Sequence, residues 1–97
     1  MSGQADRYRR MPLVEWTVSN NAVQLSPPTG KAVDLVGSAA VVWAVLEEPR
    51  TLAAVTREAF DLDPALDEYQ VRTILESLVA QRVVARDAAD GAGDVAV

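Results

Sequence analysis

The chain has 97 residues, of which 49% are apolar and 24% charged, and its net charge at pH 7 is −5. It contains no cysteine and no histidine, which excludes disulfides, thiol catalysis, Cys-ligated metals and the commonest general base. We therefore expect a single domain without metal or cofactor, and the acidic balance disfavours nucleic acid as a partner.

Residues 1–12 are polar, with arginines at Arg7, Arg9 and Arg10. They predict a flexible N-terminus, the alternative being an arm that contacts an acidic partner. The stretch has neither the apolar segment nor the small-residue cleavage site of a signal peptide. No apolar run in the chain reaches the roughly 18 residues that a bilayer-spanning helix needs. We expect a cytoplasmic protein that does not enter a membrane.

Three short antiparallel strands are predicted in the first half of the chain. They span residues 13–18, 22–25 and 31–36, and the turns between them are rich in asparagine or in proline and glycine. In the first strand apolar and polar residues partly alternate, so Val14, Trp16 and Val18 should share one face, with Leu13, Glu15 and Thr17 on the other.

Three helices are predicted after the strands. The first begins at Ser38 and is ended by Pro49, and the others span residues 52–60 and 64–81. Each helix starts at a residue whose side chain can cap it: Ser38, Thr51 and Asp63.

The C-terminal part of the chain contains one apolar pair and then an acidic tail. Val83 and Val84 either add a short strand or cover the core, and residues 87–97 are predicted to be disordered. Because the strands come first and the helices follow, the order of elements indicates an α+β domain.

No pattern in the chain predicts catalysis. The glycines do not have the spacing of a phosphate-binding loop. The carboxylate pairs Glu47–Glu48 and Asp61/Asp63 lie at helix ends, where acids commonly serve as caps or loop residues. We expect a protein that is not an enzyme.

A DNA-binding function is one alternative, because the helices over residues 52–60 and 64–81 resemble a helix-turn-helix. In a winged-helix transcription regulator the second of them would be the recognition helix. Its outward residues would be Tyr69, Arg72, Thr73, Glu76 and Ala80. One arginine among acidic neighbours is a weak reader of phosphates or bases, and the acidic net charge also counts against this alternative.

The strand over residues 31–36 is the more informative element. If the three strands follow one another in the sheet, this strand lies at an edge, where its unpaired N–H and C=O groups can accept a peptide as an added strand. Lys31 and Asp34 are the only residues of this strand whose charge would oppose the addition of another strand. The alternative, which these residues leave equally open, is that the chain's own N-terminus or a second copy, in a homodimer, covers it.

A family resemblance supports peptide binding. The chain over residues 29–64 and 69–84 resembles PqqD-like RiPP recognition elements, which bind the leader peptides of ribosomally made, post-translationally modified peptides. The similar positions are Gly30 in its turn, Leu35, the stretch of residues 37–40, Trp43, Thr51-Leu52, Phe60-Asp61, Asp63-Pro64, Val71, Leu75, Leu78 and Val83-Val84. The resemblance implies a winged helix-turn-helix fold over residues 13–86, with an N-terminal three-stranded antiparallel sheet followed by three helices.

The resemblance also implies a site and partners. The leader would add beside the strand over residues 31–36, in the groove toward the last helix. The residues implied for this peptide-binding site are Lys31, Ala32, Val33, Asp34, Leu35, Gln70, Val71, Arg72, Thr73 and Ile74. The protein would deliver the precursor to a modifying enzyme or leader peptidase, as stand-alone members in lasso-peptide and quinone-cofactor pathways do, with the lasso type favoured.

Two positions depart from the family pattern. The family often has an aromatic residue where this chain has Val33, and commonly a glycine where this chain has Arg82. The first departure implies a pocket shaped for a different leader residue. We also expect Val33→Pro to weaken peptide binding, provided that the Val33 N–H points out of the sheet.

Overall fold

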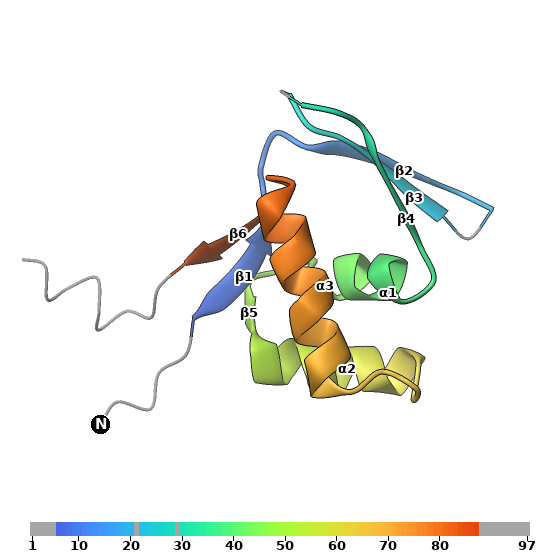
Figure 1. The fold of residues 1–97 in the computed structure, drawn as a ribbon, viewed down its shortest axis with the longest axis vertical. Coiled ribbons are helices and arrows are strands. Elements are labelled where there is room, and N and C mark those ends of the chain that lie inside the picture. Colours follow the sequence, from blue (N-terminus) through green and yellow to red (C-terminus); the bar gives the residue numbers. More distant parts are fainter. Residues whose placement is uncertain (1–5, 21, 29, 88–97) are drawn as a thin grey trace, which may run out of the picture.

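The computed structural model describes residues 6–20, 22–28 and 30–87, and these form two three-stranded antiparallel sheets and three helices (Figure 1). In chain order the elements are β1 (Arg7–Arg10), β2 (Glu15–Ser19), β3 (Ala22–Ser26), β4 (Val33–Val36), α1 (Ser38–Val45), β5 (Arg50–Thr51), α2 (Leu52–Leu62), α3 (Glu68–Ala80) and β6 (Val84–Asp87). The predicted α+β class is confirmed. Residues 1–5 and 88–97, on which parts of the predicted flexible N-terminus and disordered tail fall, lie outside the described residues.

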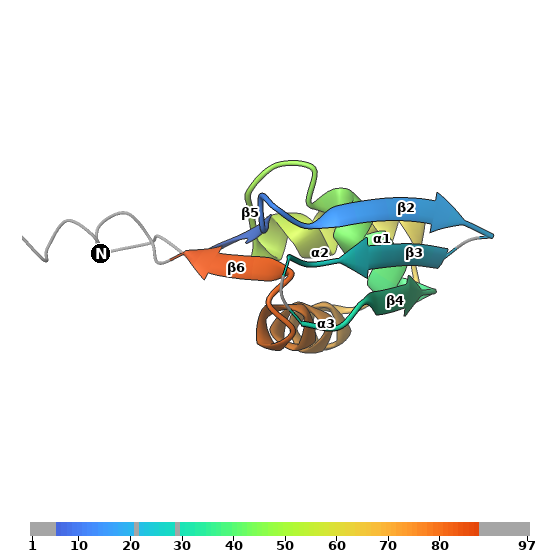
Figure 2. The same ribbon diagram turned by 90° about the horizontal axis from the view of Figure 1, so that it is seen from above.

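The predicted three-stranded meander is the sheet with the order β2-β3-β4 (Figure 2). β2 and β3 pair along their whole length, and the pair that closes their hairpin is Ser19 with Ala22. β3 pairs with β4 over Val33–Val36. The third strand is therefore shorter than predicted, because Lys31 and Ala32 precede it.

One face of this sheet covers the core. Val23, Leu25 and Leu35 are buried on it. Trp16 lies opposite Leu25 and Val18 lies opposite Val23, so both side chains share this face, as their alternation predicts.

A second sheet, with the order β5-β1-β6, corrects the prediction of a flexible N-terminus at its β1 residues. Tyr8 of β1 is buried in the core, and Arg9 forms an ion pair with Asp87 of β6 at 2.7 Å. The sequence Arg-Tyr-Arg-Arg carries one apolar side chain, so it lacks the alternation that would have predicted a strand. Its partner β6 follows Val83, and the Val83–Val84 pair both covers the core and opens this strand.

The start of α1 differs from the prediction. Its N-cap is Gly37, with φ 59°, and no side chain caps the helix. This backbone angle is in the left-handed region, which glycine adopts without steric cost, so Ser38 becomes the first helical residue instead of the cap. The helix ends at Val45, before the predicted stop at Pro49.

One predicted cap of the remaining helices is confirmed and one is wrong. The Thr51 hydroxyl accepts a hydrogen bond from the Ala54 N–H at 3.2 Å and caps α2. The Asp63 side chain does not cap α3. Instead Asp63 opens a turn through Pro64, in which the Leu66 N–H donates to the Asp63 carbonyl at 3.0 Å. Aspartate before proline suits the first position of such a turn as well as a helix start, so the pattern alone does not separate the two.

The observed start of α3 is a capping box. The Asp67 carboxylate accepts from the Gln70 N–H at 2.8 Å, and the Gln70 side-chain oxygen accepts from the Asp67 N–H at 3.1 Å. These reciprocal bonds satisfy backbone donors that the first turn of a helix leaves unpaired. The helix accordingly begins at Glu68 rather than at Pro64.

The end of α3 has the backbone hydrogen bonds of a Schellman motif. The Val83 N–H donates to the Leu78 carbonyl and the Arg82 N–H donates to the Val79 carbonyl. In this motif the residue at the Arg82 position takes left-handed angles, and its φ is 65°. Arginine thus stands where glycine fits best, which matches the departure from the family pattern seen in the sequence.

We expect Arg82→Gly to raise the free energy of unfolding by about 0.5–1 kcal/mol, because the relief of left-handed strain exceeds the extra entropy of glycine in the unfolded chain. Urea denaturation followed by circular dichroism measures the change. The matched control is Arg82→Ala, which removes the same side chain but keeps the strain. If the glycine variant is no more stable than the alanine variant, the strain at this position is negligible.

Trp43 of α1 and Arg10 of β1 connect the two sheets. The Trp43 side chain is 1% exposed, and its ring meets the Trp16 ring edge-on, with the centroids 6.1 Å apart. The Arg10 guanidinium lies 4.8 Å from the Trp16 ring centroid and 4.7 Å from that of Trp43, and it donates to the Trp43 carbonyl at 2.8 Å. Burial lowers the pKa of Arg10, and the nearby Glu47 carboxylate opposes this shift.

Candidate functional site

β4 lies at the edge of its sheet on the side of α3, whereas β2 forms the far edge (Figure 2). The predicted position of this strand at an edge is therefore confirmed for the described residues. β3 occupies one side of β4, and the described strands leave the other side without a partner. Backbone groups on that side are available to an added strand.

The register shows which backbone groups point outward. Ser19 and Ala22 close a two-residue hairpin, so they exchange hydrogen bonds with each other, and the bonding direction then alternates along each strand. It follows that Val33 and Leu35 direct their N–H and C=O groups to β3. Asp34 and Val36 direct theirs to the free side.

This register corrects one expectation from the sequence. The Val33 N–H points into the sheet, so proline at Val33 would break the pairing with Leu25 rather than test peptide binding. Asp34 is the position at which the edge can be tested without disturbing β3. Its side chain is exposed and accepts a hydrogen bond from the Gln24 amide at 3.3 Å on the outer face of the sheet.

A pocket of about 240 Å³ lies beside the N-terminal half of α3. Its lining residues are Ser38, Leu66, Tyr69, Gln70, Thr73 and Ile74. Tyr69 is 74% exposed, whereas Ile74 is half-buried against the core. Because Ser38 is the second residue after β4, the pocket is close to the C-terminal end of the free edge.

Six of the sequence-predicted site residues fall into three groups. Gln70, Thr73 and Ile74 line the pocket. The side chains of Leu35 and Val71 belong to the core, so only the backbone of β4 at Leu35 is near the edge. Arg72 is exposed on α3, 3.9 Å from the Glu68 carboxylate, and does not line the pocket.

The remaining predicted residues lie on or before β4. Lys31 and Ala32 are exposed residues that precede the strand, and Val33 is half-buried on the inner face. Asp34 is the predicted residue whose backbone faces the free side. Together with Gln70, Thr73 and Ile74, it forms the candidate site.

Three pocket residues, Ser38, Leu66 and Tyr69, were not predicted. The spacing of Tyr69 from Thr73 and of Gln70 from Ile74 is one helical turn, which places the four side chains on adjacent stripes of α3. That spacing could have identified Tyr69, which the sequence instead placed among the outward residues of a recognition helix. Ser38 and Leu66 come from other elements, and no sequence signal connects them to α3.

The Gln70 and Thr73 side chains have defined hydrogen-bonding capacity in the pocket. The Gln70 side-chain oxygen is engaged by the Asp67 N–H, which leaves the amide NH₂ to donate. The Thr73 hydroxyl donates to the Tyr69 carbonyl at 2.9 Å, which leaves its lone pairs to accept. The pocket lining therefore includes one donor and one acceptor in addition to the apolar side chains of Leu66 and Ile74.

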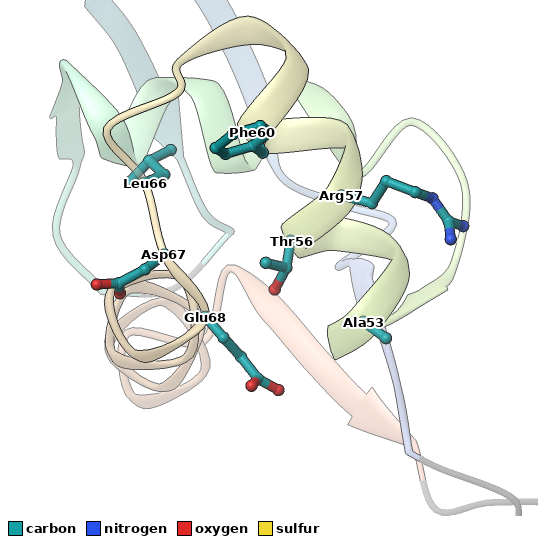
Figure 3. A pocket seen from close by; sticks show the side chains of 7 residues that line it. All are labelled: Ala53, Thr56, Arg57, Phe60, Leu66, Asp67 and Glu68. Carbon is teal, nitrogen blue, oxygen red and sulfur yellow. The ribbon is translucent and has the colours of Figure 1, made fainter.

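A second hollow, of about 500 Å³, lies between α2 and α3 (Figure 3). Phe60 and Leu66 supply apolar surface, Arg57 projects from α2, and Asp67 and Glu68 project from the start of α3. This hollow is lined by no residue of β4, so it is separate from the strand edge.

Catalytic and metal-binding features are not found among residues 6–20, 22–28 and 30–87. In these ranges no polar or charged residue is buried, and no three acidic side chains come close enough to hold a metal ion. No described helix has the length and apolar character to cross a membrane. The described residues thus offer an unpaired edge at β4 and a pocket beside α3.

Comparison with known proteins identifies one family. The model of one protein family, described as coenzyme PQQ synthesis protein D (PqqD), matches residues 21–84, well over half of the chain. The match includes β4, Ser38 and the whole of α3. Searches of curated proteins and of solved structures gave no match.

Proposed function

The chain belongs to the PqqD family, and from that membership we propose that it binds the leader segment of a ribosomally made precursor peptide as a fourth strand beside β4. The family is one of accessory proteins that bind precursor peptides and perform no chemistry themselves. We propose further that this protein delivers the precursor to a modifying enzyme or leader peptidase, in a pathway of the lasso-peptide type.

The free edge of β4 is the observation that carries the proposal. Asp34 and Val36 each offer an outward N–H and C=O, and alternate residues of a strand are about 6.6–6.8 Å apart. A peptide added beside β4 would therefore bond through every second residue. Backbone bonds of this kind supply affinity that does not depend on the peptide sequence.

The pocket beside α3 would supply sequence preference. Its volume, about 240 Å³, suits a single large side chain, and the Leu66 and Ile74 side chains in its lining favour an apolar or aromatic one. The Gln70 amide and the Thr73 hydroxyl at the margin would bond to a polar tip or to the peptide backbone. With Tyr69 exposed beside them, the side chain that enters would gain an aromatic contact.

An NMR titration with a synthetic peptide tests this proposal, the peptide being the leader of the precursor encoded nearest to this gene. We expect shifts for residues 31–36 and for Tyr69, Gln70, Thr73 and Ile74. Hydrogen exchange of the Asp34 and Val36 amides should slow on binding, whereas the Val33 and Leu35 amides, already bonded to β3, should change little. Shifts confined to α2 and the outer face of α3 would contradict the proposal.

A further inference from the structure

The β2-β3-β4 sheet has a second edge, formed by β2. All five residues of β2 are exposed, and the strand contains no proline and one charge, at Glu15. Among the described residues no strand pairs with its outer side. An open edge with so little charge is one that natural proteins normally cover or block.

The register again identifies the outward backbone groups. Since Ser19 exchanges hydrogen bonds with Ala22, Thr17 does so with Gln24, and the residues between them face the other way. Trp16 and Val18 thus direct their N–H and C=O groups to the free side of β2. These two residues are two positions apart in the strand. They can therefore exchange backbone hydrogen bonds with the same two residues of an identical strand that runs in the opposite direction.

In an antiparallel β2–β2 pair centred on Thr17, the outward backbone N–H and C=O groups of both copies form hydrogen bonds. Trp16 of each copy then lies opposite Val18 of the other, so each outward N–H meets an outward C=O. Glu15 lies opposite Ser19, which avoids the juxtaposition of like charges that would destabilise such a pair. The strand is therefore complementary to itself in both hydrogen bonding and charge.

The side chains of this edge also carry apolar surface that remains uncovered. Trp16 is 43% exposed and Val18 is 64% exposed, and both lie on the inner face of the sheet. They line a hollow of about 380 Å³ together with Arg10, Val23, Trp43, Ala44 and Glu47. A second β2 would set its own Trp16 and Val18 against this surface, in the aromatic and β-branched cross-strand pairs that stabilise sheets.

We propose that β2 is a self-association edge, through which two copies of this chain join their sheets into one six-stranded antiparallel sheet. The β4 strands form the two outer edges of the joined sheet, so each copy keeps its peptide edge free. Asp6 and Asp87, where the described part of the chain begins and ends, lie at the β5-β1-β6 sheet and not at β2.

Val18→Lys tests the proposal, and Val36→Lys is its matched control. The two valines are equally exposed, at 64%, and lie on opposite edges of the same sheet. In sedimentation velocity from micromolar to near-millimolar protein, the parent should approach twice the monomer mass of 10.4 kDa. Val18→Lys should weaken self-association on the order of tenfold or more, because both Trp16 pairs are lost, and Val36→Lys should dimerise as the parent does.

Hydrogen exchange gives an independent result at residue level. In the parent protein the Trp16 and Val18 amides should exchange more slowly as protein concentration rises, without added peptide, while the Asp34 and Val36 amides do not change. A parent that stays monomeric, or concentration-dependent protection at Asp34 and Val36, overturns the proposal. So does slowing at Trp16 and Val18 that requires the leader peptide, which would assign β2 to the peptide.

Discussion

Asp34→Pro is expected to weaken binding of the leader peptide by about 10- to 100-fold, while the fold is retained. Proline removes the outward N–H of Asp34 and leaves a peptide carbonyl without a donor, a loss of about 1–3 kcal/mol. The hydrogen bonds between β4 and β3 run through Val33 and Leu35, so they are unaffected. Isothermal titration calorimetry measures the affinity, and thermal denaturation shows that the fold persists.

Two controls distinguish the lost donor from other effects of this substitution. Asp34→Ala removes the carboxylate and its bond to Gln24 but keeps the N–H, so it should bind nearly as the parent does. Val33→Pro removes a donor to Leu25 and should lower stability as well as binding. If Asp34→Pro binds the leader as tightly as Asp34→Ala, the peptide does not pair with β4 in the proposed register.

Trp43→Ala is expected to lower the free energy of unfolding by about 3–5 kcal/mol, the range for truncating a large buried aromatic residue. Trp43 is packed in the core, and its ring also contacts Trp16 and Arg10. The substitution therefore creates a cavity and removes one of the two rings against which the Arg10 guanidinium lies, while its hydrogen bond to the carbonyl of residue 43 remains. Since small domains have only about 5–15 kcal/mol of stability, urea denaturation should show a large fall in the midpoint.

Trp43→Phe is the control for this effect. The Trp43 indole N–H is buried, and no acceptor lies within hydrogen-bonding distance among the described residues. Phenylalanine keeps most of the ring and removes this unpaired donor, so it should cost much less than alanine. A phenylalanine variant as unstable as the alanine variant would show that the indole N–H makes a bond that stabilises the fold.

The sequence predicted those parts of the fold that have a periodic apolar pattern. The meander follows from alternation in short runs between turn residues, and Val71, Leu75 and Leu78 identify the buried stripe of α3. β1 was missed because three arginines surround its single buried residue, Tyr8. Its strand structure depends on distant partners in β5 and β6, and local periodicity carries no information about these.

The candidate site could be predicted to the level of elements but not of atoms. The order of strands made β4 an edge, and the resemblance pointed to α3. The residues of β4 whose N–H groups point out of the sheet depend on which pair of residues closes the β2–β3 hairpin. A shift of the register by one residue would turn the Val33 N–H outward in place of the Asp34 N–H. Likewise Val71 and Ile74 differ by less than one turn of α3, yet one is fully buried and the other lines the pocket.

The β5-β1-β6 sheet determines where the described fold can be joined to a tag, a surface or another protein. Asp6 and Arg86 form an ion pair at 3.2 Å, so the chain enters and leaves the described fold at neighbouring points. Both points lie at the β5-β1-β6 sheet, at the left of the view in Figure 1, and not at the β2-β3-β4 sheet. A purification tag, a surface tether or a fused protein joined directly to Asp6 or Asp87 would therefore begin at the β5-β1-β6 sheet and not at β2 or β4.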